Sequence, residues 1–170
     1  MKKLVLALSL LTFAATPAVA QMKVDVGVPG LKGRSCYMPE EAEAEEGIKI
    51  HSELMVIALN CQHMTPKGWK NFYQQYREIT ARNADLIGGY ENVLINYFAL
   101  AGASNPEVSF HNMRTSFANQ VSTDAAKMRP DIFCATYAPR LPKVDRMSTA
   151  DLKGWAKSAS ANGVSRPLCH

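Results

Sequence analysis

The chain has 170 residues, of which 19 are basic, 15 are acidic and 47% are hydrophobic, and its formal net charge is +4. This composition is too apolar for a disordered chain, and its length fits one domain. The weak positive charge does not indicate a nucleic-acid-binding protein.

Residues 1–20 carry the features of a secretory signal peptide. Lys2 and Lys3 precede an apolar run over residues 4–15, and Ala18-Val19-Ala20 predicts cleavage before Gln21. Cleavage removes two of the 19 basic residues and leaves 17 against 15 acidic ones, a net charge of +2. No later apolar run reaches the ~18 residues of a membrane span. The sequence therefore predicts a periplasmic or secreted protein with no transmembrane segment in the mature chain.

Residues 21–38 are rich in glycine and proline, which predicts an irregular leading segment before a single helical domain over residues 39–170. Pro39 begins the first predicted helix, whose apolar stripe consists of Ile50, Leu54, Ile57 and Cys61. The first turns of this helix carry Glu40, Glu41, Glu43, Glu45 and Glu46. We expect this acidic block to be a solvated face that also complements the helix dipole.

A second, long helix is predicted over residues 67–102, with Thr65-Pro66 as its start. Its stripe alternates steps of three and four through Trp69, Phe72, Tyr76, Ile79, Asn83, Leu86, Tyr90, Val93, Tyr97 and Leu100. Only Asn83 interrupts the apolar series. Gly88-Gly89 lies off the stripe and is the main alternative site for a break or kink.

A third helix is predicted to start at Asn105-Pro106 and to be kinked or ended by Pro130. Pro139 and Pro142 indicate a linker, and the capping box at residues 148–151 predicts a short fourth helix. No segment shows sustained period-two alternation. The predicted fold is all-α, an up-down-up three-helix bundle with a short C-terminal helix.

Four cysteines in an exported chain predict two disulfides. The spacing contains neither a thioredoxin-like pair nor a c-type haem motif. In this bundle the end of the first helix, with Cys61, lies beside the end of the third helix, with Cys134. The start of the first helix, near Cys36, lies toward the end of the chain, which carries Cys169. We therefore predict the pairs Cys61–Cys134 and Cys36–Cys169.

Motifs for catalysis, metal binding and nucleotide binding are absent from the sequence. The histidines at positions 51, 63, 111 and 170 lack metal-ligand spacing, so neither a metal nor a cofactor is expected. Glu53 is a weak catalytic candidate for a cell-wall glycan hydrolase, because its apolar neighbours indicate partial burial and a raised pKa.

Tyrosines on the long helix are candidate binding residues, because a buried tyrosine keeps a hydroxyl group that needs a partner. Tyr76, Tyr90 and Tyr97 are the chosen positions. Ordinary core packing explains the same spacing. If the long helix extends beyond the first helix, the third helix, the leading segment or a second copy of the chain could cover its far end, and the last of these gives the hypothesis of a homo-oligomer through this helix.

The run from Ser52 to Cys61, with Phe72, Tyr76 and the Phe133-Cys134 pair, resembles a group of small exported four-cysteine helical proteins of bacteria. The resemblance implies fold and export and no catalytic residue. The sequence therefore favours a non-catalytic binding or structural role in the cell envelope, with an envelope protein or cell-wall component as partner and no role in nucleic-acid binding.

Overall fold

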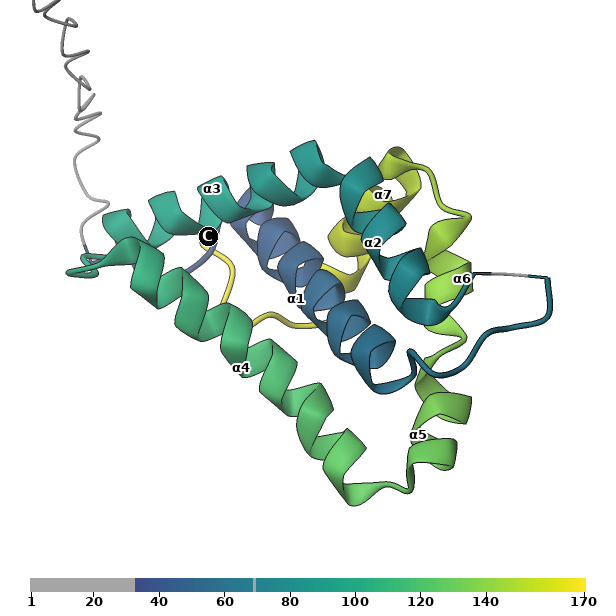
Figure 1. Ribbon diagram of the computed structural model, residues 1–170. Coiled ribbons are helices and arrows are strands. Elements are labelled where there is room, and N and C mark those ends of the chain that lie inside the picture. The colour runs from purple at the N-terminus through teal and green to yellow at the C-terminus, as the bar shows by residue number, and fades with distance from the viewer. Residues whose placement is uncertain (1–32, 69) are drawn as a thin grey trace, which may run out of the picture.

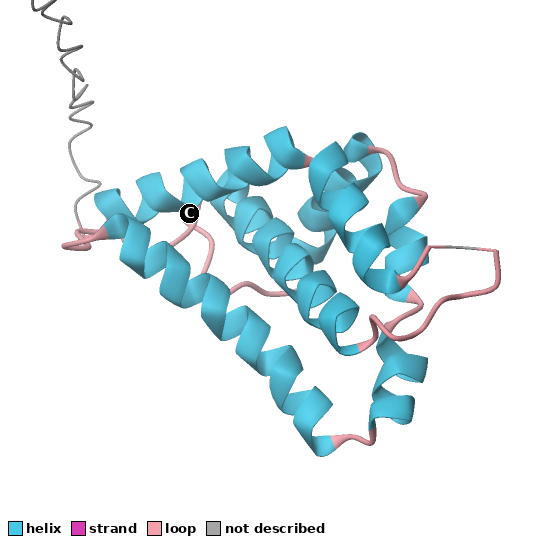
Figure 2. Cartoon of the chain, viewed as in Figure 1, coloured by secondary structure: helices cyan, strands magenta, loops and turns pink. Residues whose placement is uncertain are grey.

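The computed structural model describes residues 33–68 and 70–170, which form helices joined by turns and loops (Figures 1 and 2). The helices are α1 (Pro39–Asn60), α2 (Phe72–Arg82), α3 (Ala84–Leu100), α4 (Pro106–Lys127), α5 (Pro130–Tyr137), α6 (Arg140–Asp145) and α7 (Thr149–Ser160). These residues form no β-strand, and one parallel bridge joins Tyr37 to Leu168. The predicted all-α class is confirmed. The predicted signal peptide and most of the leading segment lie outside the described residues.

Helix α1 is the centre of the molecule. Helices α3 and α4 diverge from their shared loop on either side of it, and α7 packs against it as well (Figure 1). The predicted stripe of α1 is buried throughout. The core around α1 is completed by Leu94, Tyr97, Phe110, Phe133, Leu141 and Leu152. Burial from several sides makes α1 the scaffold on which the other helices are positioned.

The acidic block of α1 is the largest departure from the sequence prediction. Glu41, Glu43, Glu45 and Glu46 are only 8, 9, 2 and 8% exposed, whereas Glu40 is exposed. The prediction of a solvated face is therefore wrong for four of these five residues. They are buried because the first half of α1 is covered by α3, by α7 and by two terminal segments, residues 33–38 and 164–169.

Each buried glutamate has a hydrogen-bonding partner, as a buried carboxylate requires. Glu41 pairs with Arg34 and accepts from the Met38 amide at 2.7 Å. Glu45 accepts from the Tyr37 hydroxyl at 2.6 Å and from the Ser165 amide at 2.6 Å. These contacts tie both terminal segments to α1.

The predicted long helix is two helices, which separate at Asn83 rather than at Gly88-Gly89. Asn83 has the non-helical dihedrals φ −109° and ψ 20°. Its side-chain amide donates to the Ile79 carbonyl at 2.8 Å, and its side-chain oxygen accepts from Thr149 at 2.8 Å. Helix α2 ends at Asn83 because side-chain hydrogen bonds of this kind compete with the backbone hydrogen bonds of a helix. The Asn83 side chain bonds both to a carbonyl of α2 and to Thr149 of α7.

Two boundaries also differ from the prediction. Helix α2 begins at Phe72 and not after Thr65-Pro66, because Asn71 forms the capping box with Gln74. The predicted linker around Pro142 contains the short helix α6, whose Leu141 and Val144 side chains are buried. With α2 and α3 separate and α1 central, the up-down-up three-helix arrangement is not confirmed.

Other boundaries follow the sequence. Helix α4 begins at Pro106 with Asn105 as its cap, and Pro130 begins a separate helix, α5. Helix α7 begins after the capping box of Ser148 and Asp151. Both predicted disulfides, Cys36–Cys169 and Cys61–Cys134, are confirmed. No helix within the described part of the chain has the length and apolar character that crossing a membrane requires.

Candidate functional site

A groove of about 260 Å³ lies between α1, α3 and α7, and we call it the acidic groove. It is lined by Glu40, Glu43, Asp85, Leu86, Gly89, Tyr90, Val93 and Lys153. Glu40 and Glu43 come from α1, Lys153 comes from α7 and the remaining residues come from α3. The groove therefore forms where α3 crosses the first half of α1.

Glu43 is the most deeply placed charge of the acidic groove, with 9% of its surface exposed. Its Oε1 accepts a hydrogen bond from the Tyr90 hydroxyl at 2.9 Å and lies 3.9 Å from the Lys153 ammonium. No hydrogen bond joins its Oε2 to another described residue. One oxygen of this nearly buried carboxylate, in a residue that lines the groove, thus has no hydrogen-bond partner among the described residues.

The acidic groove combines negative charge with apolar side chains. Three carboxylates (Glu40, Glu43 and Asp85) oppose one ammonium (Lys153), so the net charge of the lining is −2. Leu86 and Val93 supply apolar surface beside these charges. This lining suits a cation carried on an apolar stem, because burial of the stem and attraction of the charge then act together.

Gly89 keeps the acidic groove open. A Cβ built at this position meets no heavy atom within 4 Å, so the space beside the backbone is free. Gly88, its neighbour in α3, is equally open but does not line the groove. These two glycines therefore provide a matched pair for testing the groove without altering its charges.

Of the three predicted binding tyrosines, only Tyr90 lines the acidic groove. Its hydroxyl lies in a buried environment beside Glu43, and this burial with the carboxylate raises the pKa of the tyrosine. The hydroxyl is therefore protonated and donates to Glu43 at ordinary pH.

Tyr76 and Tyr97 lie elsewhere. Tyr76 stacks on His51 and places its hydroxyl 3.1 Å from the histidine Nε2. Tyr97 lies edge-on to Tyr37, with the guanidinium groups of Arg34 and Arg166 each 5.4 Å from its ring centroid. The structure thus distributes the three tyrosines over three environments rather than one groove.

His51 occupies a buried polar position in the middle of α1. Its Nε2 lies 3.2 Å from the Thr80 hydroxyl, and its Nδ1 is buried with no partner in the described residues. Burial, and secondarily the charge of Arg114, lowers the pKa of His51 to about 4. Within residues 33–68 and 70–170, no group of three or more His, Cys, Asp or Glu side chains is placed to hold a metal ion.

Glu53, the catalytic candidate, is half-buried on α1 and forms an ion pair with Arg140 of α6 at 3.0 Å. Desolvation raises its pKa, against the opposing effect of Arg140 and Lys49. The raised pKa agrees in direction with the expectation for a general acid, but the carboxylate is engaged by a guanidinium. Glu53 does not line the acidic groove.

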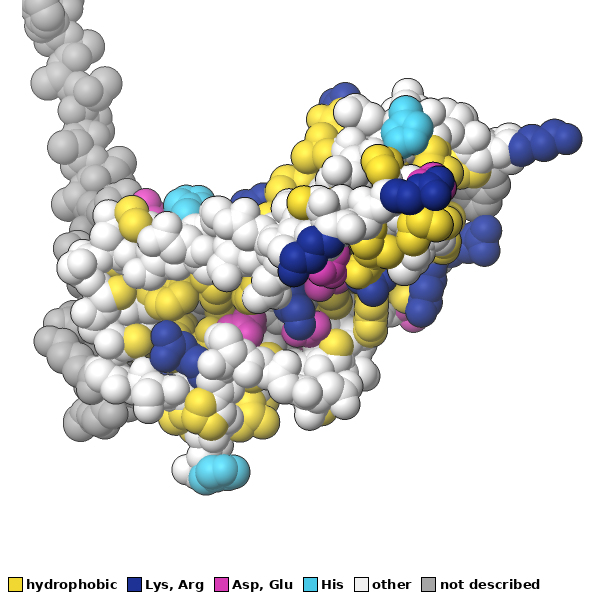
Figure 3. Space-filling view, turned by 90° about the horizontal axis from the view of Figure 1, so that it is seen from below, with side chains coloured by type: hydrophobic (Ala, Val, Ile, Leu, Met, Phe, Trp, Pro, Cys, Tyr) yellow, Lys and Arg dark blue, Asp and Glu magenta, His cyan; other side chains and the backbone are white. Residues whose placement is uncertain are grey.

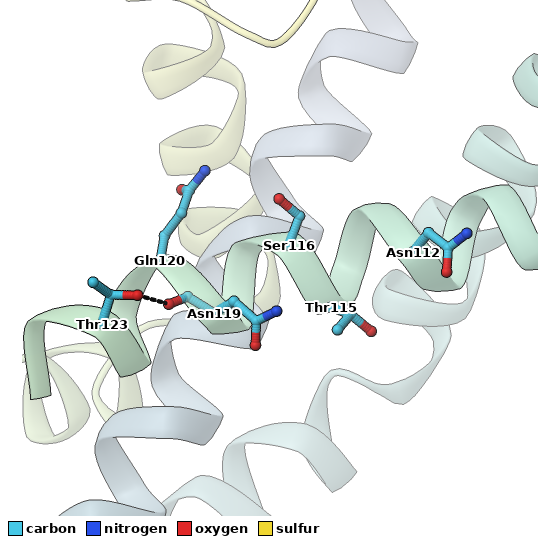
Figure 4. A pocket seen from close by; sticks show the side chains of 6 residues that line it. All are labelled: Asn112, Thr115, Ser116, Asn119, Gln120 and Thr123. Carbon is cyan, nitrogen blue, oxygen red and sulfur yellow. Dashed lines mark hydrogen bonds between the residues drawn. The ribbon is translucent and has the colours of Figure 1, made fainter. Parts of the chain in front are cut away.

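Helix α4 presents a second, shallower depression, which is entirely uncharged (Figure 4). It is lined by Asn112, Thr115, Ser116, Asn119, Gln120 and Thr123. All six belong to one exposed helix face, and the Thr123 hydroxyl donates to the Asn119 carbonyl of the same helix at 2.8 Å. A single helix face offers hydrogen-bonding groups without a second wall, so it encloses a ligand less than the acidic groove does.

The surface seen from below is mixed in character (Figure 3). Hydrophobic side chains form several patches on it, and basic side chains are spaced apart, some of them beside acidic ones. This face therefore carries no continuous basic surface of the kind that contacts a nucleic-acid backbone.

Sequence reasoning missed most of the acidic groove. Glu40 and Glu43 were recognised only as part of an acidic block, and Asp85, Leu86, Val93 and Lys153 have no distinguishing motif. The one signal was Gly88-Gly89, since two adjacent glycines inside a predicted helix lower helix stability and therefore indicate a packing or functional reason. The sequence made them only the main alternative site for a break or kink, whereas in the structure Gly89 lines the groove.

Comparison with known proteins finds no matching family model, curated protein or solved structure. The function is therefore argued from the geometry of the groove.

Proposed function

We propose that the protein is an exported, non-catalytic binding protein of the cell envelope, and that the acidic groove holds its partner. The observation that carries this proposal is Glu43, a nearly buried carboxylate that lines the groove and has one oxygen without a hydrogen-bond partner among the described residues. Burial of a charge is unfavourable unless it is compensated, so an open position beside it favours a cationic ligand.

The disulfides support the proposed location. Cys36–Cys169 and Cys61–Cys134 account for all four cysteines, and none is free. Disulfides persist in oxidising compartments such as the periplasm and the extracellular space. The same pairing supports a non-catalytic role, since no thiolate remains as a nucleophile.

A matched pair of variants tests the proposed function. Gly89→Leu fills the acidic groove, whereas Gly88→Leu adds the same side chain to the same helix outside it. In crosslinked capture from envelope fractions, we expect the wild type and Gly88→Leu to retain one common partner, which Gly89→Leu loses.

A second part of the same experiment changes the charge of the groove. Asp85→Asn removes one carboxylate at an exposed position. We expect it to weaken capture, and added salt to weaken capture by the wild type, since exposed charges are screened within ~8 Å at physiological ionic strength. Identical capture by wild type, Gly89→Leu and Asp85→Asn would contradict the proposal.

The second candidate is a cell-wall glycan hydrolase with Glu53 as its general acid. The raised pKa of this carboxyl group favours it. Clearing of cell-wall material by the wild type that is lost in Glu53→Gln and kept in Glu78→Gln would support this activity. Equal clearing by all three proteins, or none by the wild type, would exclude it.

Self-association through α2 is a further proposal. Tyr73 of α2 remains 36% exposed, which leaves apolar surface on this helix for a second copy. Light scattering at micromolar concentration measures the mass directly, and a monomer would contradict the proposal.

A further inference from the structure

The hydrogen-bonding groups of the acidic groove differ in whether their donors and acceptors are already used in hydrogen bonds. Glu43 Oε1 accepts a hydrogen bond from Tyr90, whereas no hydrogen bond joins Oε2 to another described residue. The Tyr90 oxygen donates its only proton to Glu43 and keeps lone pairs that accept. Glu40 and Asp85 add carboxylates at the rim. The groove thus offers several acceptors and, apart from Lys153, no charged donor.

A primary ammonium fits this arrangement better than other cations. It has three N–H donors that can reach separate acceptors, whereas a guanidinium achieves its strength through two parallel bonds to both oxygens of one carboxylate. With Oε1 of Glu43 already bonded to Tyr90, that two-point contact is impeded. A metal ion needs convergent ligands, and the described residues hold no such group.

Lys153 shows how an ammonium approaches Glu43. Its Nζ lies 3.9 Å from Oε1, beyond hydrogen-bond range, and its side chain is 60% exposed. The internal ammonium therefore partly neutralises the carboxylate without satisfying it. An external ammonium that bonds to Glu43 would have to displace Lys153 toward solvent.

We propose that the acidic groove binds the side chain of a lysine in an exposed segment of a partner protein, and that Lys153 is an internal competitor for this position. The apolar stem of the incoming lysine lies against Leu86 and Val93, while its ammonium bonds to Glu43. The inference rests on the proposed function and names the chemistry of its partner.

The test titrates the full mature chain with the peptide acetyl-Val-Lys-Val-amide. Binding is monitored by the NMR chemical shift of the Gly89 amide. We expect saturable binding by the wild type, and none by a peptide with norleucine in place of lysine. The arginine peptide should bind more weakly than the lysine peptide. Equal binding of the norleucine peptide would overturn the inference.

Lys153→Met supplies the decisive comparison. Removing the internal competitor should tighten binding of the lysine peptide about twofold to fivefold, the range of a weak exposed ion pair. Lys157→Met, one turn further along α7, should leave the affinity unchanged. Unchanged or weaker binding by Lys153→Met would contradict the competition.

Three further outcomes separate the proposals. If butane-1,4-diamine binds as tightly as the lysine peptide, a protein partner is contradicted as the source of the ammonium. If Gly89→Leu loses the envelope partner but the wild type binds no lysine peptide, the proposed function stands and this inference fails. The opposite pattern would support the ammonium site and contradict the envelope partner.

Discussion

Single residues on α1 decide how closely its neighbours approach. A Cβ at Gly47 would lie 2.3 Å from Tyr90 Cε2, a distance that real side chains do not tolerate. Tyr90 in turn bonds to Glu43 at 2.9 Å. The absence of a side chain at Gly47 therefore permits the contact between α1 and α3 and orients the tyrosine of the acidic groove.

Gly47→Ala is expected to destabilise the protein despite the better helix propensity of alanine. Overpacking of this kind costs about 1–3 kcal/mol. Gly88→Ala, whose Cβ meets nothing within 4 Å, is expected to be neutral or to stabilise by up to ~1 kcal/mol. Urea unfolding of both variants measures the difference, and equal stability of the two would contradict the close packing at Gly47.

Stability at acid pH should depend on His51. Its folded pKa of about 4 lies below the ordinary value of 6.5, so the unfolded chain binds the proton more readily. The stabilisation is fully present above pH 6.5 and is lost as the pH falls toward 4, a change of about 3 kcal/mol.

The measurement is the melting temperature of wild type and His51→Leu between pH 4 and 7. We expect the wild type to lose more stability than His51→Leu over this range, and His63→Gln, at an exposed position, to follow the wild type. Parallel curves for all three proteins would show that His51 titrates normally.

At the scale of the elements, the sequence predicted helix starts better than helix continuity. Asn105 and Ser148 were predictable as caps, because the side chain of a cap accepts a hydrogen bond from a backbone amide only three residues later in the sequence. The break at Asn83 was not, because its side chain bonds to Thr149, which is 66 residues away. The acidic groove also depends on long-range packing, the crossing of α1 and α3, so local patterns contain little information about it.

Asn83 and Thr149 should be energetically coupled. Asn83→Ala leaves the Thr149 hydroxyl without its acceptor, and we expect a loss of about 1–3 kcal/mol. Thr149→Val removes the donor and should reduce the further effect of Asn83→Ala. A double-mutant cycle measures this coupling, and strict additivity would contradict it.

At the scale of the whole molecule, the disulfide pairs were predictable although the bundle was not confirmed. Their prediction required only that the end of α1 lie near α5 and that the segment just before α1 lie near the C-terminal residues, and both conditions hold in the more complex fold. Burial of the glutamates was not predictable, since the residues that cover them, such as Ser165, lie up to 120 positions away.

The two disulfides should differ in accessibility. Cys61 and Cys134 are 0 and 1% exposed, whereas Cys36 and Cys169 are both partly exposed. A low concentration of dithiol is expected to reduce Cys36–Cys169 first. Alkylation and mass spectrometry identify the reduced pair, and earlier labelling of Cys61 and Cys134 would contradict this order.

The two loops closed by the disulfides are nested: the pair at positions 61 and 134 lies inside the pair at positions 36 and 169. During synthesis from the N-terminus, Cys36 and Cys61 emerge first, yet neither is the other's partner. Oxidation in order of appearance would join the wrong sulfurs. Correct maturation therefore waits for the last residues of the chain or requires an isomerase to exchange early pairs.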